Sequence, residues 1–162
     1  MAEVRLSRAF GVGPSGIVLS AALLAVAYWV KSYVPLPPLF GGPTIPRVAL
    51  AAGVVFSILM VIWSVRSLPI ADRGRGVCTR GAYRYVRHPV YAAFSSIGAI
   101  GLALYCNHPV FLLWFVAVQL LWRWLVRFEE QMMVVEFGAQ YERYMESTGQ
   151  LFPRFGRRRS GP

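Results

Sequence analysis

The stretch YRYVRHPVY, residues 83–91, places Arg84, Arg87 and His88 directly before an apolar run. A charged group in hydrocarbon is unfavourable by several kcal/mol, so such side chains at the edge of an apolar segment usually have a polar partner. The proline after His88 disfavours helical geometry at the histidine and itself suits the first turn of a helix. We therefore expect a helix to begin here, with free N–H groups and basic side chains that favour a carboxylate or phosphate.

The alternative for these cations is contact with anionic lipid head groups, which is the usual role of arginines beside a membrane span. We favour that interpretation for three arginines of the preceding loop, Arg73, Arg75 and Arg80. At the helix start itself, for Arg87, His88 and Tyr91, we favour a binding site.

A second polar group lies in LLWRWLVRFEEQM, residues 120–132. Four polar residues recur there at helical spacings of four, four and three, which predicts one polar stripe: Gln119, Arg123, Arg127 and Glu130. On a helix Glu129 points about 100° away from Glu130, so both can hardly pair with the same arginine. One carboxylate is then left to bind a cation. The alternative is an ordinary interfacial belt of Trp side chains with Arg–Glu pairs.

The apolar residues that position these groups make up 56% of the 162 residues and come in long blocks. Mean hydropathy is +0.49, and this distribution is typical of an integral membrane protein. Four blocks, residues 15–34, 48–65, 90–106 and 109–126, are each close to the roughly 20 residues that span a bilayer. We predict an all-α membrane protein with about four transmembrane helices and one domain over residues 1–162.

The third and fourth helices are joined only by Cys106, Asn107, His108 and Pro109, which predicts a tight antiparallel hairpin. We expect Asn107 to cap the fourth helix and Pro109 to lie in its first turn. Small residues four apart in the third helix would let the helices pack closely: Ser95, Ala99 and Ala103.

The hairpin would return the end of the fourth helix to the start of the third. Glu129 and Glu130 would then approach His88 and its neighbours. An anion-favouring helix start beside a free carboxylate is what a zwitterionic amino-acid group needs.

The net charge of +10 comes from arginines in the gaps between apolar blocks, which favours membrane topology over nucleic-acid binding. The positive-inside rule places both termini and the loop 66–89 in the cytoplasm. Ala25-Val26-Ala27 also resembles a leader cleavage site, but the apolar run continues beyond it, so we prefer a retained span. His88 and His108 would lie on opposite membrane faces and the cysteines form no ligand cluster, so we expect no metal.

An ordered series of motifs resembles the isoprenylcysteine carboxyl methyltransferase family and its phospholipid N-methyltransferase relatives. It runs from Thr79-x-Gly81-x-Tyr83-Arg84-x-x-Arg87-His88-Pro89-x-Tyr91 through Glu129-Glu130 and Phe137-Gly138-x-x-Tyr141-x-x-Tyr144 to Phe152-Pro153-Arg154. The match covers roughly the C-terminal half. One departure is Ala93, where the family often has glycine, and it puts the cofactor contact near this position in question.

The resemblance implies a membrane methyltransferase that uses S-adenosyl-L-methionine, bound at the cytoplasmic face by the last two helices and the C-terminal segment. Residues 1–65 would then hold two N-terminal spans, 66–89 the cytoplasmic basic loop and 90–162 the cofactor-binding half. The residues predicted to bind the cofactor are Tyr83, Arg84, His88, Pro89, Tyr91, Glu129, Glu130, Tyr141 and Tyr144. Arg87 and Glu130 are the predicted catalytic residues, and the segment that carries Tyr141 and Tyr144 is a predicted lid.

The methyl acceptor is expected to be lipophilic and to come from the bilayer, most like a prenylcysteine carboxylate that Arg87 would hold. A carboxylate needs no general base, and the sequence shows no dedicated one. Phospholipid amines and thiols stay open as acceptors. A sterol-type reductase that uses NADPH is a more distant alternative, because paired glutamates would repel its phosphates, and so is a non-catalytic membrane subunit. Membrane lipids are the other expected partners.

Overall fold

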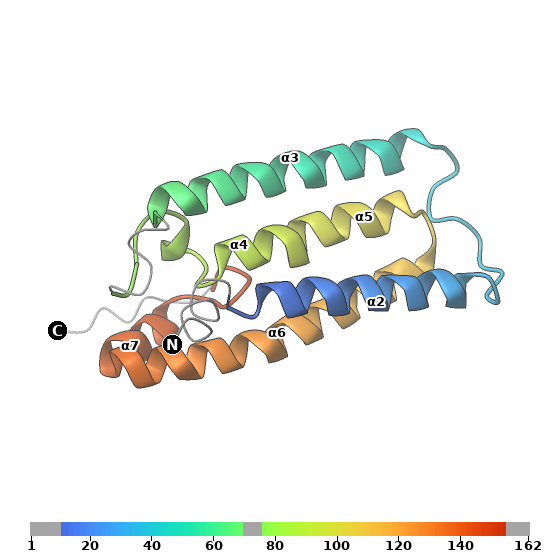
Figure 1. The fold of residues 1–162 in the computed structure, drawn as a ribbon. Helices are drawn as coiled ribbons and strands as arrows, with labels where there is room; N and C mark the ends of the chain where they lie inside the picture. The colour runs from blue at the N-terminus through green and yellow to red at the C-terminus, as the bar shows by residue number, and fades with distance from the viewer. Residues whose placement is uncertain (1–10, 70–75, 155–162) are drawn as a thin grey trace.

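The computed structural model describes residues 11–69 and 76–154, and this part of the chain forms helices and connecting loops with no β-strand (Figure 1). In chain order the elements are α2 (Gly13–Lys31), α3 (Thr44–Ser67), the 3-10 turn η2 (Gly81–Arg84), α4 (Pro89–Ala92), the π-helical turn η3 (Ala93–Gly98), α5 (Ala99–Tyr105), α6 (Pro109–Phe137) and α7 (Ala139–Ser147). The segments α4, η3 and α5 follow one another without a break and form one apolar helix, Pro89–Tyr105.

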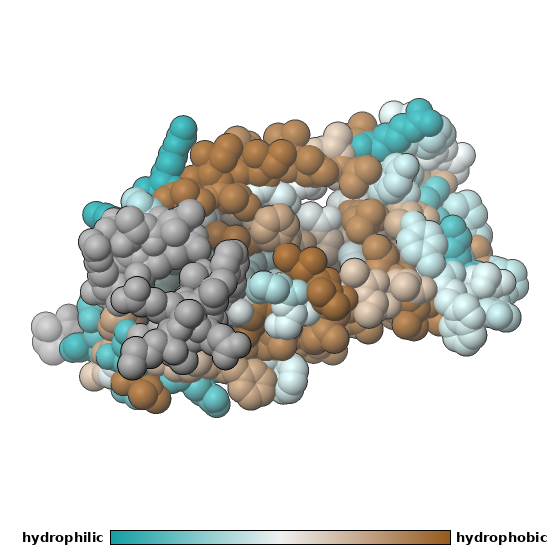
Figure 2. All heavy atoms as spheres, viewed as in Figure 1, coloured by the Kyte–Doolittle hydropathy of each residue, from teal (hydrophilic) through white to brown (hydrophobic). Residues whose placement is uncertain are grey.

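Three of the described helices, α2, α3 and α6, are long and apolar enough to cross a membrane. The predicted all-α membrane class is confirmed, while the third predicted span, Pro89–Tyr105, is a shorter apolar helix. Large apolar side chains lie on the outside of α3, with Phe56 59% exposed and Leu59 54% exposed. Figure 2 shows such residues along the middle of the face on view and hydrophilic ones toward both ends. A lipid environment explains this surface, because a soluble monomer rarely exposes so much apolar area.

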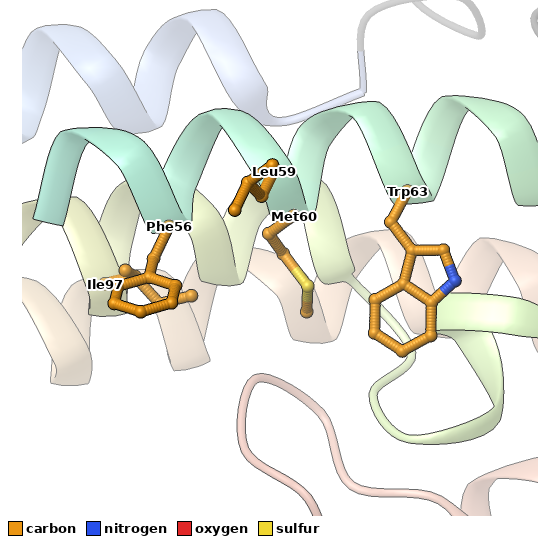
Figure 3. A pocket seen from close by; sticks show the side chains of 5 residues that line it. All are labelled: Phe56, Leu59, Met60, Trp63 and Ile97. Atoms are coloured by element: carbon orange, nitrogen blue, oxygen red, sulfur yellow. The ribbon is translucent and has the colours of Figure 1, made fainter. Parts of the chain in front are cut away.

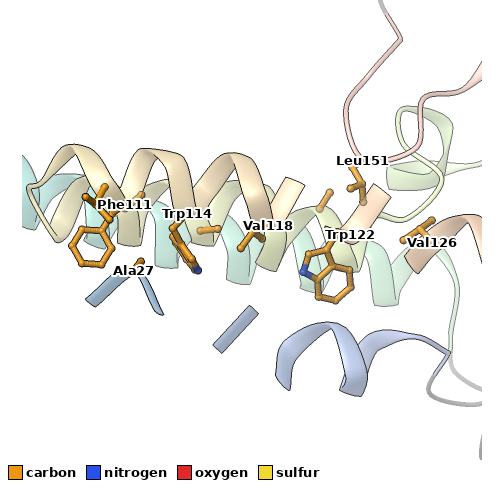
Figure 4. Packing of buried hydrophobic residues seen from close by; sticks show 11 residues of the cluster. Ala27, Phe111, Trp114, Val118, Trp122, Val126 and Leu151 are labelled. Carbon is orange, nitrogen blue, oxygen red and sulfur yellow. The ribbon is translucent and has the colours of Figure 1, made fainter. Parts of the chain in front are cut away.

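The helices pack in the order α3, α4–η3–α5, α6, α2 (Figure 1). The buried cluster is built mainly from α6 side chains one or two turns apart, with Ala27 of α2 and Leu151 of the C-terminal segment against them (Figure 4). Two indoles of α6 also donate hydrogen bonds to α2: Trp122 to the Ser20 hydroxyl at 2.9 Å, and Trp114 to the Ser20 carbonyl at 3.2 Å. These bonds fix α2 against α6 both along and around its axis.

Residues 106–108 connect α5 to α6, and the predicted cap at Asn107 is wrong. The N-cap of α6 is His108, whose Nδ1 accepts a hydrogen bond from the Val110 N–H at 3.3 Å. Asn107 instead has a φ of 51°, a conformation that asparagine tolerates better than most residues. Its amide makes two hydrogen bonds with the backbone of Phe40, at 2.8 and 3.0 Å. The asparagine therefore holds the α2–α3 loop.

The turn η3 widens the helix directly after Tyr91. A π-turn leaves carbonyl groups without their usual helical donors, and inside a membrane such groups need other partners. The Ser57 hydroxyl donates to the Ala93 carbonyl at 2.7 Å, and the Gln119 amide donates to the Ser95 carbonyl. Ala93, the departure from the family pattern, is completely buried. Two neighbouring helices thus satisfy the turn.

Small residues bring α3 into close contact with α5. A Cβ atom on Gly101 would lie 2.9 Å from the Ala49 carbonyl oxygen and 3.0 Å from the Gly53 Cα. Both neighbours are backbone atoms that cannot rotate away. The small residues Ser95, Ala99 and Ala103 were predicted to pack in the hairpin of the third and fourth helices, whereas this close contact joins Gly101 of α5 to α3.

We predict that Gly101→Val destabilises the protein by about 1–3 kcal/mol, because the added side chain overpacks this contact. Thermal unfolding in detergent measures the change. Ala51→Val places the same side chain on an exposed position of α3 and serves as the control. Equal unfolding temperatures for the two variants would contradict the close α3–α5 contact.

Candidate active site

Glu130 joins three segments at one end of the helix bundle. Its Oε1 accepts hydrogen bonds from Arg87 Nε at 2.7 Å and from His88 Nε2 at 3.2 Å. Its Oε2 accepts one from Gln150 Nε2 at 3.0 Å. The side chain of Glu130 is only 6% exposed and that of Arg87 only 9%. A buried carboxylate is tolerated when it is paired and fully hydrogen-bonded, as it is here.

Glu129 lies beside this cluster and is more accessible, with its side chain 24% exposed. Its Oε2 accepts a hydrogen bond from the Tyr91 hydroxyl at 3.0 Å, and its Oε1 lies 3.9 Å from His88 Nδ1. The His88 and Tyr91 rings stack with an interplanar angle of 4°. The structure therefore brings both carboxylates to the start of the helix at Pro89. Glu130 is paired with Arg87, and Glu129 is hydrogen-bonded to Tyr91.

The C-terminal segment is hydrogen-bonded to the residues just before that helix. The N–H groups of Arg87 and His88 donate to the carbonyls of Gly149 and Gln150, at 2.8 and 3.2 Å. The Arg87 guanidinium also donates to the Met145 carbonyl at 3.0 Å and to the Thr148 carbonyl. Arg87 is thus engaged on both sides, with Glu130 and with the carbonyls of Met145 and Thr148.

Tyr141 and Tyr144 of α7 are buried against this cluster, with 3% and 7% exposure. The Tyr144 hydroxyl donates to the Tyr83 carbonyl at 2.5 Å. Burial raises the pKa of both hydroxyls well above the usual range, and the nearby Glu130 carboxylate raises that of Tyr141 further. Both phenols stay neutral at physiological pH, so neither is a general base.

The remaining predicted site residues are less central. Arg84 is exposed, whereas Pro89 is buried as the first residue of α4, as the sequence predicts. The residues of the predicted polar stripe lie on one continuous helix, α6, but differ in burial: Glu130 is buried, while Arg123 and Arg127 are exposed. Among the described residues no cluster of three or more His, Cys, Asp or Glu side chains could hold a metal ion.

Sequence reasoning missed several contributors to the site. Gln150 completes the hydrogen bonds of Glu130, and Trp122 packs on Tyr91 with ring centroids 5.1 Å apart. The backbone N–H of Val12 lies 3.5 Å from Glu129 Oε2. The only signal for the last was the run of glycines at residues 11, 13 and 16, which alone is too weak to predict a contact.

An apolar groove of about 580 Å³ lies between α3 and η3 (Figure 3). Its lining residues are Phe56, Leu59, Met60, Trp63 and Ile97. The Trp63 indole lies at one end of the groove and packs against the Tyr85 ring, with ring centroids 5.7 Å apart. None of these residues belongs to the Glu129–Glu130 cluster.

Comparisons with known proteins point to one family. The phospholipid methyltransferase family profile matches residues 47–140. The probable protein-S-isoprenylcysteine O-methyltransferases of Oryza sativa subsp. indica and subsp. japonica are each 31% identical over 130 residues, which is 78% of this chain and 63% of the relative. Protein-S-isoprenylcysteine O-methyltransferase A of Arabidopsis thaliana is 33% identical over 85 residues, 51% of this chain and 42% of the relative. No solved structure matches. The resemblance seen in the motifs is confirmed.

We predict that Arg87→Met destabilises the protein by about 3 kcal/mol, because it leaves the Glu130 carboxylate buried without its cation. Hydrogen exchange should rise at the Arg87 and His88 amides, which pair with the C-terminal segment. Arg127→Met, on the exposed side of α6, is the matched control. Unchanged stability and exchange in Arg87→Met would show that this ion pair does not hold the segment.

Proposed function

The chain belongs to the phospholipid methyltransferase family, and on that premise we propose that it transfers a methyl group from S-adenosylmethionine to a lipophilic acceptor. The observation that carries the proposal is the position of the partly exposed Glu129 carboxylate beside His88 and Tyr91. The chain covers 63% of the length of the rice relatives, so their activity is extended to it here only as a proposal.

The side chains of Glu129 and His88 fit the amino-acid part of such a cofactor. That part carries an ammonium group, for which the accessible Glu129 carboxylate is the natural partner, and a carboxylate, for which His88 and the helix start are suitable. When bound, S-adenosylmethionine supplies an electrophilic methyl group on a sulfonium. No metal or covalent residue is needed for its displacement.

The side chains of this cluster have different roles in the proposal. Glu129, His88 and Tyr91 bind and orient the cofactor, while Glu130 is a positioning residue that is already occupied by Arg87, His88 and Gln150. Arg87 was predicted to hold an acceptor carboxylate. Because its Nε and Nη1 are engaged and it is buried, we propose that it acts mainly through Glu130.

The docked α7 is proposed to cover the site. Its buried Tyr141 and Tyr144 would exclude water, which strengthens the electrostatic interactions beneath them. Their hydroxyls stay neutral, so these two residues do not supply a base.

For the membrane topology we propose four spans, with Pro89–Tyr105 as the third and α6 as its antiparallel neighbour. Both termini and the loop 66–89 would lie in the cytoplasm. α6 has 29 residues and is therefore about 43 Å long, which exceeds the roughly 30 Å hydrocarbon thickness. Its last turns, with Glu129 and Glu130, would reach the interface, where a soluble cofactor and a bilayer substrate can meet.

For the acceptor we propose a prenylcysteine-type carboxylate, with phospholipid amines and thiols as the alternatives. The support is that the rice and Arabidopsis relatives are named as protein-S-isoprenylcysteine O-methyltransferases. The hydrocarbon chain of the acceptor would lie in the groove between α3 and η3 (Figure 3), whose lining is entirely apolar side chains.

We expect detergent-purified protein to bind S-adenosylmethionine in calorimetry and to transfer labelled methyl to a prenylcysteine. Glu129→Gln should weaken binding about tenfold, because it removes the charge opposite the ammonium group. Glu136→Gln, at an exposed position of the same helix, is the control. Label in a phospholipid extract alone would reassign the acceptor, and binding of NADPH without S-adenosylmethionine would refute the methyltransferase.

We also predict that Leu59→Trp fills part of the groove and raises KM for a long-chain prenylcysteine several-fold while cofactor affinity stays the same. Ile58→Trp places the same bulk on a neighbouring exposed position outside the groove. If a short-chain acceptor lost as much activity as the long-chain one, the groove would not hold the chain.

A further inference from the structure

The chain segment that leads into α2, Gly11 and Val12, lies directly against the Glu129–Tyr91 pair. The Val12 N–H donates to Glu129 Oε2 at 3.5 Å, so this oxygen accepts from two elements, the Tyr91 hydroxyl and the α2 backbone. Val12 is the N-cap of α2 and cannot cap with its own side chain, and the first turn of α2 has no acidic residue. Glu129 therefore supplies from α6 the negative charge that a helix N-terminus favours.

Gly11 has no room for a side chain. A Cβ atom there would lie 2.6 Å from the Tyr91 hydroxyl oxygen and 2.7 Å from Glu129 Oε2. Its φ of +52° also belongs to the left-handed region that glycine adopts without strain. The backbone at this point thus touches both side chains of the proposed cofactor site.

The position of this segment is fixed by the rest of α2. A Cβ atom on Gly16 would lie 2.7 Å from the Trp122 indole, which in turn donates to the Ser20 hydroxyl at 2.9 Å. Trp122 also packs on Tyr91. Gly11 and Gly16 therefore let the start of α2 lie close to the site, and the Trp122–Ser20 hydrogen bond holds it there.

We propose that Gly11 and Val12 form one wall of the proposed cofactor site and position the Glu129 carboxylate. The inference rests on the proposed function and assigns a role to the N-terminal helix, which shares no motif with the resemblance. Oε2 of Glu129 is held by Tyr91 and Val12, so that Oε1, on the His88 side, faces the ammonium group of the bound amino-acid part.

The test compares two ligands that differ in the amino-acid part. Gly11→Ala should weaken S-adenosylhomocysteine about tenfold but leave 5′-methylthioadenosine, which lacks that part, nearly unchanged. Val12→Pro, at a native φ of −82° that is close to the proline range, removes the N–H donor and should weaken the first ligand a few-fold. Val12→Ala keeps the N–H and reports the loss of the side chain alone. An equal loss of affinity for both ligands, or no loss of affinity for either, would overturn the proposal.

A second measurement needs no ligand. Gly11→Ala should lower the unfolding temperature, because the added Cβ would lie 2.6 Å from the Tyr91 hydroxyl oxygen. Adding Tyr91→Phe to Gly11→Ala removes the contacted oxygen and should restore part of the loss. If Tyr91→Phe restored none of the loss, the contact would be refuted. If the wild type bound neither ligand, the proposed function would fail, while this comparison would still decide whether the wall exists.

Discussion

The ion pair between Arg87 and Glu130 is the interaction on which the rest of this site depends. It joins the segment before the helix at Pro89 to the end of α6, and the same guanidinium holds backbone carbonyls of the C-terminal segment. Burying one of these charges alone would cost several kcal/mol, so the pair and its additional hydrogen bonds form together or not at all. Three segments far apart in the sequence are thereby fixed around one carboxylate.

This constraint separates the two neighbouring glutamates. Glu130 is nearly enclosed and fully engaged, whereas Glu129 is partly exposed and is held by Tyr91 and the start of α2. A site that must bind a cationic group needs a carboxylate that is oriented but not neutralised by a buried cation. The enclosed carboxylate provides the rigidity, and the exposed one is available to a ligand.

The sequence predicted the parts of this arrangement that depend on local rules. Pro89 begins a helix because proline suits the first turn, and three of the four apolar blocks form helices long enough to span a membrane. The cap of α6 was assigned to Asn107 because asparagine favours that position, but the asparagine bonds to Phe40 of the α2–α3 loop and His108 caps the helix instead. The spacing of the predicted stripe gave no sign that Arg123 is exposed while Glu130 is buried, because burial depends on which segments pack against α6.

Contacts that depend on helix packing could not be predicted in this way. The π-turn after Tyr91 is satisfied by Ser57 and Gln119 from two other helices, and nothing in its own residues requires it. Gln150 and Val12 reach the glutamates only when the bundle is assembled. The most direct measurement is an experimental structure with S-adenosylhomocysteine bound. The account predicts the ligand's amino nitrogen within hydrogen-bond distance of the Glu129 carboxylate, and a ligand bound away from Glu129 and His88 would contradict it.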